Sequence, residues 1–373
     1  MTSTIFEPRV RPRGGRPLVA ERLKIPRPGV PVLQRPRVTE LIRRAATRRI
    51  TLTCGPAGSG KTVACALWAA AARPAGRVAW LALDQDDRQP GRLWDDLWGA
   101  MASAPGIPGE ITGERPRPEG EPYPLRLAAA AERLNAPVTL VIDNVQELAG
   151  CEALASLDLL IRTGPPALHL LLVGRHATGL QVARQRVDGE LAEIGPADLA
   201  CSPDEVERYF ATLGTDLQQS QLDELVSRTE GWMTGLRLAA LHATAAGPAA
   251  PPWRLSGDEP AVADYLRAEV LSAQSASRRL FLLRTCITDR IGGSLADAMT
   301  AGSDGAAVLD QLWRENVMIR HADRQDGAAE SADYAYHPLL LDLLRAELRT
   351  ELPDEIPALA GRAARWQAAH GMK

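Results

Sequence analysis

The stretch that decides the fold is ITLTCGPAGSGKT, residues 50–62. Its first five residues form an apolar, β-branched run that predicts a buried strand, and the remainder fits the pattern G-x-x-x-x-G-K-[ST]. A helix is expected from residue 62. A strand, a glycine-rich loop and a helix in this order predict a P-loop, in which backbone N–H groups and the helix N-terminus bind phosphate. The predicted nucleotide-binding residues are Gly55, Pro56, Ala57, Gly58, Ser59, Gly60, Lys61 and Thr62.

Two of these side chains have specific roles in the predicted site. Lys61 would place its charge on the β- and γ-phosphates of ATP or ADP, and Thr62 would offer its hydroxyl to Mg²⁺. Lysine is otherwise found only at positions 24 and 373, which makes a lysine inside the motif more informative.

Two later apolar runs end in polar residues. VTLVIDN, residues 138–144, predicts a strand whose Asp143 holds Mg²⁺, although a polar cap at a strand end would show the same pattern. Asp143 and Asn144 are the candidate catalytic residues. Asn144 stands where many hydrolysing P-loop proteins have a second acid that activates water. Because an amide cannot accept a proton in that role, we expect ATP hydrolysis to be slow. Arg175 follows LHLLLV, residues 168–173, and is either a γ-phosphate sensor or a surface arginine.

The wider pattern sets the fold class. Apolar runs at 50–54, 78–83, 138–142 and 168–173 alternate with helical stretches, which predicts a parallel sheet with helices on both faces. After a capping box at Ser202 and Glu205 the chain reads as helix to about residue 250. Further helices are expected at 261–272, 276–286, 294–300, 305–316, from Pro338, and at 355–370. VMIRHA and DYAYH predict a hairpin, and three helices before a hairpin indicate a winged helix.

Composition excludes several other classes. The chain has 373 residues, which suggests two or three domains, and 45% hydrophobic with 24% charged residues is ordinary for a globular protein. A net charge of −3 argues against coating nucleic acid or membrane with the whole surface. Five scattered cysteines without metal-ligand spacing favour a reducing compartment, the cytoplasm. No apolar run is long enough to span a membrane, and the N-terminus lacks a signal-peptide pattern.

Several blocks appear together in a fixed order: RITLTCGPAGSGKT, VAWLALDQDD, VTLVIDN, LHLLLVGR, TEGWMTGLRLAAL, DYLRAEVL, FLLRTC and YHPLLLDLLRAEL. In this combination the chain resembles the ATPase core of large LuxR-family regulators of the MalT-like type, which belong to the STAND class of P-loop NTPases. The resemblance implies a P-loop domain, an all-helical domain and a winged-helix domain. Expected boundaries are a basic flexible leader at 1–30, nucleotide-binding domain 31–197, helical domain 198–250, winged-helix domain 251–352, and the start of a truncated helical sensor region at 353–373.

The resemblance also implies site residues. Arg35 and Arg37 would lie near the base, Gly235 would form a short turn at the nucleotide, and Arg175 would match the sensor arginine. His337 would reach the β-phosphate of ADP in the inactive state, and its alternative role is that of a turn residue before Pro338. Arg237 stands where related proteins often carry proline, and Asn144 departs from the usual second aspartate.

The function implied is that of a switch. ADP would hold the modules closed, and ATP with an inducer would open them and permit self-association. A P-loop ATPase enzyme of another class is the alternative. DNA binding by the winged helix itself is disfavoured, because the helix at 305–316 carries Asp310, Arg314 and Glu315 with a net negative charge. DNA contact is instead expected from a C-terminal helix-turn-helix that this chain does not contain, and no membrane partner is expected.

Overall fold

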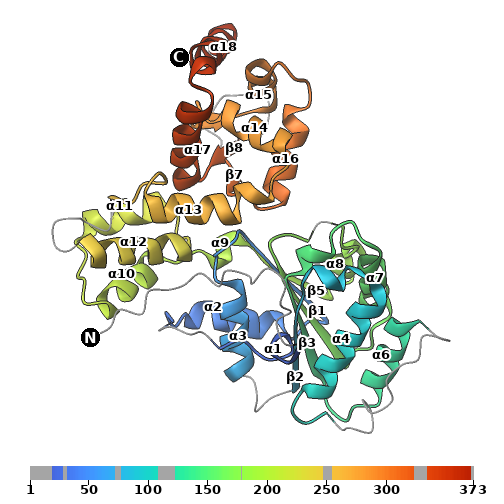
Figure 1. Ribbon diagram of the computed structural model, residues 1–373. Helices are drawn as coiled ribbons and strands as arrows, with labels where there is room; N and C mark the ends of the chain where they lie inside the picture. Colours follow the sequence, from blue (N-terminus) through green and yellow to red (C-terminus); the bar gives the residue numbers. More distant parts are fainter. Residues whose placement is uncertain are drawn as a thin grey trace.

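The computed structural model describes residues 19–27, 32–71, 77–107, 122–177, 179–246, 254–322 and 334–370, and the structural statements below concern these residues. Figure 1 shows three units that follow one another along the chain: an α/β unit, a group of helices beside it, and a second helix-rich unit at the far end.

The α/β unit is built on a sheet of five strands in the order β2-β3-β4-β1-β5, and every pair is parallel. The four strands predicted from apolar runs are present, and β5 is additional. Its sequence, LAEI, is too short and too polar to be recognised as a strand by its pattern. The strands are β1 (Ile50–Cys54), β2 (Arg77–Ala82), β3 (Val138–Asp143), β4 (Leu168–Gly174) and β5 (Leu191–Ile194).

Helices cover both faces of the sheet, as predicted. Alternate residues of β3 serve the two faces: Val141 lies in one core, and Leu140 and Ile142 lie in the other. In Figure 1, α2 (Pro36–Ala45) and α3 (Lys61–Ala71) flank one face, whereas α4 (Pro90–Ser103), α6 (Tyr123–Glu132) and α7 (Glu152–Thr163) flank the other. Shorter elements of this unit are η1 (Gln85–Arg88), η2 (Val145–Leu148), α8 (Ala183–Val187) and α9 (Pro196–Leu199).

The prediction of a flexible leader over residues 1–30 is wrong for residues 19–27. This segment contains α1 (Val19–Arg22), and Arg22 is only 8% exposed. Its guanidinium pairs with Asp84, Asp87 and Asp96, which belong to the segment that follows β2 and to α4. Burial raises the pKa of Asp87 to about 6, although Arg22 acts in the opposite direction. A buried arginine facing three carboxylates fixes the segment to the sheet. The other residues of the predicted leader, 1–18 and 28–30, lie outside the described residues.

The second unit contains the helices α10 (Pro203–Thr212), α11 (Gln219–Thr229) and α12 (Met233–Ala246). The predicted capping box is confirmed, since the Ser202 hydroxyl accepts from the Glu205 N–H and the Glu205 carboxylate accepts from the Ser202 N–H. The long helical stretch that we expected after residue 214 is broken between α11 and α12. Glu230 and Gly231 both have positive φ there, which ends α11 and turns the chain.

The third unit combines α13 (Pro260–Glu269) with a winged helix. The predicted hairpin is present as β7 and β8, and a short strand β6 that the sequence did not indicate pairs with β8. The buried Thr285 and Tyr336 hydroxyls lie 2.7 Å apart and tie α14 to β8. The elements are η5 (Leu271–Ala273), α14 (Ala276–Thr285), β6 (Arg290–Ile291), α15 (Gly293–Thr300), α16 (Gly305–Arg314), β7 (Ile319–His321), β8 (Tyr334–Tyr336), α17 (Pro338–Glu351), η6 (Pro353–Glu355) and α18 (Ile356–Ala369).

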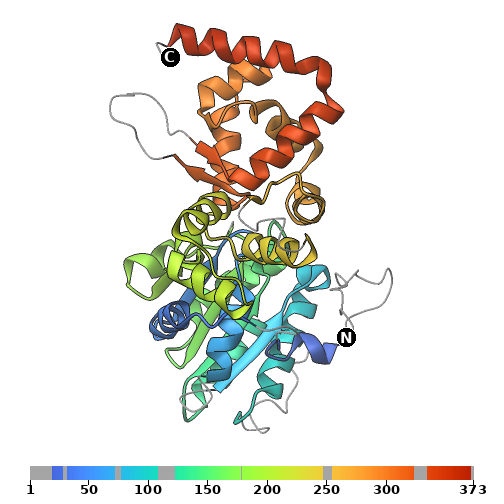
Figure 2. The ribbon, with the colours of Figure 1, turned by 90° about the vertical axis from the view of Figure 1, so that its left-hand side faces the viewer.

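The second and third units share one continuous hydrophobic core, in which Leu236 of α12, Leu266 of α13 and Leu339 of α17 are fully buried. Figure 2 shows α18 crossing the far end of the third unit, where its Leu359 joins the same core. Among the described helices, none is both long enough and apolar enough to cross a membrane.

Candidate functional site

The sheet brings the predicted phosphate-binding residues to one edge. In the parallel register Cys54, the last residue of β1, lies beside Gly174, and Asp143 lies beside Val173. The P-loop, Asp143 and Arg175 therefore leave the sheet at the carboxyl ends of adjacent strands. This is where ligands bind in open α/β sheets.

The loop from Gly55 to Gly60 has the shape that phosphate binding requires. Gly58 and Gly60 have φ values of 72° and 86°, a conformation that favours glycine and lets successive N–H groups converge. Lys61 begins α3, and its ammonium donates to the carbonyls of Gly55 and Pro56, each at 2.8 Å. Burial lowers the pKa of Lys61 to about 8; Asp143 opposes this and Arg175 adds to it. A bound phosphate would supply the negative charge that this buried ammonium needs.

Thr62 and Asp143 form the pair expected at a magnesium site. The Thr62 hydroxyl donates to the Asp143 carboxylate at 2.9 Å, and the other oxygen of that carboxylate accepts from the Asn144 N–H. Burial raises the pKa of Asp143, while these two hydrogen bonds act against the rise. A hydroxyl and a carboxylate side by side at the end of a P-loop fit the oxygen ligands that Mg²⁺ takes.

The Asn144 side chain bonds to the backbone. The residue adopts the left-handed conformation, with φ of 62°, and its side-chain amide lies 3.4 Å from the Leu83 carbonyl at the end of β2. Asparagine tolerates this conformation better than most residues. The position predicted for a second acid is therefore held by an amide that bonds weakly to the backbone.

A cavity of about 350 Å³ borders the P-loop. Pro56 and Ser59 of the loop line it, and His337 lines it from the third unit. Residues of all three units thus meet around one space. The remaining lining residues are Pro196, Ala197, Leu199, Ala200, Glu230, Gly231, Trp232, Trp313, Asn316, Met318, Ile319 and Arg320.

His337 has a structural role as well as a place at the cavity. It caps α17, where its Nδ1 accepts from the Leu339 N–H at 3.3 Å, and its Nε2 lies 2.9 Å from the Thr229 carbonyl. This pattern requires a neutral ring that donates through Nε2. Burial lowers the pKa of His337, which favours that neutral form. Both ring nitrogens therefore have protein partners, so contact with a phosphate would require Nε2 to leave Thr229.

Arg175 reaches across to another unit. Its guanidinium donates to the Glu269 carbonyl at 2.7 Å and pairs with the Glu269 carboxylate at 2.6 Å, at the end of α13. Its own carbonyl accepts from the Asn316 amide at 2.7 Å. Arg175 is thus placed at the correct edge of the sheet, and its side chain is engaged by α13.

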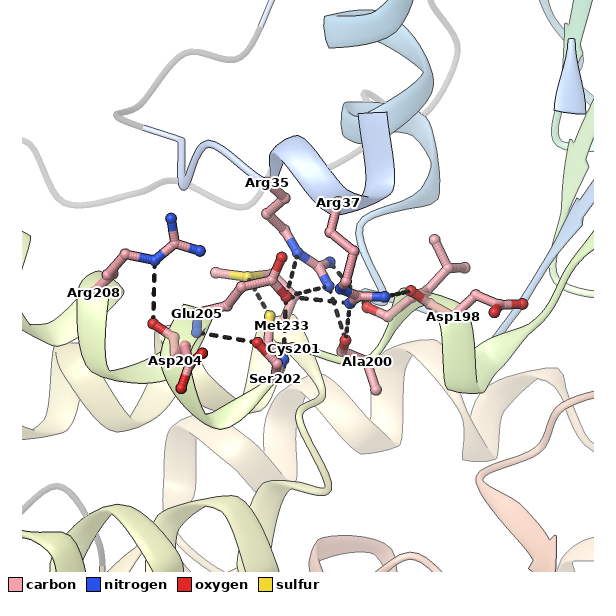
Figure 3. A network of polar contacts seen from close by, with 11 residues as sticks. Arg35, Arg37, Asp198, Ala200, Cys201, Ser202, Asp204, Glu205, Arg208 and Met233 are labelled. Atoms are coloured by element: carbon pink, nitrogen blue, oxygen red, sulfur yellow. Dashed lines mark hydrogen bonds and ion pairs between the residues drawn. The ribbon is translucent and has the colours of Figure 1, made fainter. Parts of the chain in front are cut away.

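Arg35 and Arg37 do not line the cavity but contact residues that do. Figure 3 shows both guanidinium groups at the start of α2 directed onto the segment between α9 and α10. Arg35 donates to the carbonyls of Leu199 and Ala200, each at 2.9 Å, and both arginines pair with Glu205. Burial raises the pKa of Glu205, but the two arginines and the Ser202 N–H more than offset this and hold it below its ordinary value. The arginines therefore fix the wall of the cavity without lining it.

Gly235 does not line this cavity either. It lies in the first turn of α12, where a Cβ would come within 2.8 Å of the Trp232 ring. The absence of a side chain makes room for Trp232, which does line the cavity and which donates to the Ala57 carbonyl. Our sequence reasoning missed Trp232 and Thr234, although both are in the block TEGWMTG that carried the resemblance. It also missed Glu269, for which the sequence offers no local signal.

Comparisons with known proteins show which proteins this chain is similar to. Residues 267–356 match the family model of the MalT winged helix domain. The chain is 30% identical over 346 residues to the HTH-type transcriptional regulator MalT of Yersinia pestis, with 90% of this chain and 37% of that protein covered. It is 27% identical over 355 residues to the serine/threonine-protein kinase PknK of Mycobacterium tuberculosis, with 92% of this chain and 32% of that protein covered. The chain spans about a third of the length of these relatives.

Among solved structures, the Walker-type ATPase PABY2304 of Pyrococcus abyssi is similar, with a TM-score of 0.59 at 15% identity and coverage of 84% of this chain and 96% of that one. This likeness shows the P-loop ATPase fold. The predicted fold class, an α/β P-loop domain followed by helical and winged-helix units, is confirmed, and so is the predicted resemblance to MalT-like regulators.

Proposed function

We propose that this chain, whose residues 267–356 match the MalT winged helix domain, is the nucleotide-dependent switch of a transcriptional regulator. ADP would hold the three units closed, and ATP with an inducer would open them and permit self-association. The observation that carries the proposal is the cavity beside the P-loop, because it is lined by Ser59 of the first unit, Trp232 of the second and His337 of the third. A nucleotide bound there would contact all three units at once.

The difference between ADP and ATP would be read by Arg175. A ligand shifts a conformational equilibrium only through contacts that differ between the two states. Arg175 is close enough to Lys61 to lower its pKa, and it is also paired with Glu269 of α13. A γ-phosphate next to Lys61 would compete with Glu269 for the Arg175 guanidinium and weaken the contact between the first unit and α13.

The remaining parts of the proposed site are local. Lys61 and the loop N–H groups would hold the β-phosphate, and Thr62 and Asp143 would hold Mg²⁺, which neutralises phosphate charge when bound. Arg35 and Arg37 would keep the wall around Leu199 in place beside the base. With Asn144 in place of an acid, the switch would hydrolyse ATP slowly or not at all.

Substitution of Lys61 tests the site. Wild type at a nucleotide concentration about 100 times its dissociation constant should gain about 2.7 kcal/mol of stability. Lys61→Ala removes the buried ammonium and should abolish most of the thermal shift with ADP or ATP. Lys24→Ala, at an exposed lysine outside the site, is the matched control and should retain the full shift. An undiminished shift in Lys61→Ala would contradict the assignment.

A P-loop enzyme of another class is the second candidate, and one relative is named a kinase. Within the described ranges, no group of three or more histidine, cysteine or acidic residues could form a separate metal centre. DNA binding by the winged helix also has little support, because Arg314 pairs with Asp310 and Arg320 pairs with Glu230. We therefore assign DNA binding to a helix-turn-helix of the kind named in the MalT relatives, outside these residues.

A further inference from the structure

Two carbonyl groups of the P-loop receive their hydrogen bonds from the second unit. The loop directs N–H groups into its concavity, which leaves carbonyls on its outer side. Trp232 donates its indole N–H to the Ala57 carbonyl at 2.8 Å. Thr234 donates to the Gly58 carbonyl through its hydroxyl at 3.0 Å and through its backbone N–H at 3.2 Å. These donors stand about 175 residues further along the chain than the loop that they contact.

The approach of the second unit is close at this point. Gly58 has φ of 72°, and a Cβ on it would overlap the Thr234 hydroxyl and lie 2.6 Å from the Tyr265 hydroxyl. Gly58 is therefore needed both for the turn of the loop and for the contact with α12 and α13. The first turn of α12 lies directly against the loop, with no side chain between them.

Peptide geometry turns these contacts into control of the phosphate site. A peptide unit is planar and trans, so the N–H of one residue points opposite to the carbonyl of the residue before it. Fixing the Ala57 carbonyl therefore fixes the direction of the Gly58 N–H, and fixing the Gly58 carbonyl fixes that of the Ser59 N–H. These are N–H groups that a P-loop presents to phosphate.

Trp232 also connects the loop to the third unit. Its side chain is 5% exposed, and its ring centre lies 5.6 Å from that of Tyr265 and 5.8 Å from that of His337. A change in the Ala57 peptide would act first on Trp232 and, through it, on residues of α13 and α17.

We propose that Trp232 and Thr234 are positioning residues of the nucleotide site, which orient the Gly58 and Ser59 N–H groups from outside the P-loop domain. The proposal rests on the proposed nucleotide binding and goes beyond it. It makes nucleotide affinity depend on the docking of α12 onto the loop, so the phosphate site is complete only when the first two units are together.

Substitutions that remove single donors test this. Thr234→Val keeps the side-chain shape and loses the hydroxyl, and Trp232→Phe keeps an aromatic ring and loses the indole N–H. Each should weaken ADP binding about twofold to tenfold, the change produced by loss of one neutral hydrogen bond, and should raise the ADP dissociation rate. Thr234→Ser retains the donor and should bind ADP as wild type does.

Two controls remove equivalent groups far from the loop. Thr350→Val deletes a hydroxyl that bonds to the Ala346 carbonyl within α17, and Trp366→Phe alters an indole in α18. Both should leave ADP affinity unchanged. A loss in Thr234→Ser equal to that in Thr234→Val, or unchanged ADP affinity in both donor variants, would overturn the proposal.

A second measurement separates this proposal from the proposed function. Amide hydrogen exchange of the peptide containing residues 55–62, measured without nucleotide, should be faster in Thr234→Val and Trp232→Phe than in wild type and in the two controls. If wild type binds no nucleotide, but exchange at residues 55–62 is still faster in the two donor variants, the nucleotide site is refuted. The role of Trp232 and Thr234 in orienting the loop would then stand. Equal exchange in all variants would refute the positioning role itself.

Discussion

Lys61, Thr62 and Asp143 meet because a recognisable loop motif and the order of the parallel strands bring them together. The P-loop fixes the first two within one turn of a helix, and an adjacent parallel strand carries Asp143 to the same edge of the sheet. Local pattern could therefore predict this part of the site. Arg22 shows the opposite case, since neither a motif nor a strand register links it to its partners Asp84 and Asp96. Nothing in the pattern of residues 1–30 indicates which arginine will be buried.

Asn144 allows a prediction at the scale of one residue. Asn144→Asp would place a second carboxylate next to Asp143, the proposed Mg²⁺ ligand, in a backbone conformation that aspartate also tolerates. We expect ATP turnover to rise tenfold or more, because general-base catalysis typically contributes about 10²-fold to 10⁴-fold, with little change in nucleotide affinity.

Phosphate release under single-turnover conditions measures this effect. Asn144→Gly is the control, because it also removes the amide, supplies no base and tolerates the positive φ, and its turnover should stay at the wild-type level. A wild-type rate of about 1 s⁻¹ or more, typical of ordinary enzymes, would show that the missing acid does not limit hydrolysis.

At the scale of elements, the strands of the five-stranded sheet that the sequence predicted are those buried on both faces. β3 and β4 are continuous apolar runs, whereas β5 and the two-residue β6 gain their strand character from their partners, β1 and β8. The break between α11 and α12 was missed for a related reason. Glu230 adopts a positive φ that its residue type does not signal, and the carbonyl of the adjacent Gly231 accepts from the distant Cys201 N–H at 2.9 Å.

The start of α17 carries the second prediction. His337→Ala removes the N-cap acceptor and should cost at least about 0.5–2 kcal/mol of stability. His337→Asn retains an acceptor for the Leu339 N–H but also loses the ring Nε2 that bonds to Thr229, so it should lose less than His337→Ala. If the ring also reaches the β-phosphate, both variants should lower the ADP-to-ATP affinity ratio, by about tenfold. Calorimetric titration with each nucleotide measures the ratio.

The acid limb of the stability profile provides an internal check on these variants. Burial lowers the pKa of His337, so the unfolded chain takes up this proton at a higher pH than the folded chain does. The contribution of His337 to the unfolding free energy is complete above about pH 6.5 and decreases as the pH falls below that value. His337→Asn should lack this decrease. Equal losses for ADP and ATP would leave His337 as the cap of α17 alone.

At the scale of the whole molecule, several polar contacts between the first unit and the others surround the proposed phosphate site. Trp232 and Thr234 bind loop carbonyls, and Asn316 and Glu269 bind Arg175. The three-unit order was predictable from pattern and resemblance, and the family-model match at residues 267–356 agrees with it. The contacts between units were not predictable, because each joins two residues that lie about 90–175 positions apart in the sequence.

The pair between Arg175 and Glu269 carries the last prediction. Both side chains are partly exposed, at 34% and 43%, so the charge of this pair contributes no more than about 1 kcal/mol to closure, a factor of about five in an equilibrium. Glu269→Gln removes the charge and leaves the backbone carbonyl that Arg175 also uses. A γ-phosphate would then attract Arg175 without competition from the Glu269 carboxylate. ATP affinity should therefore rise about twofold to fivefold while ADP affinity stays constant.

The controls isolate the inter-unit contact. Glu355→Gln breaks a similarly exposed pair with Arg284 that lies entirely within the third unit, and it should change neither affinity. In the double variant Arg175→Ala with Glu269→Gln the gain for ATP should disappear, because the guanidinium that the phosphate would attract is absent. Solution scattering with ATP should show a larger radius of gyration for Glu269→Gln than for wild type. A parallel change in ADP and ATP affinity, or a gain that survives in the double variant, would mean that Arg175 holds the units together without sensing the γ-phosphate.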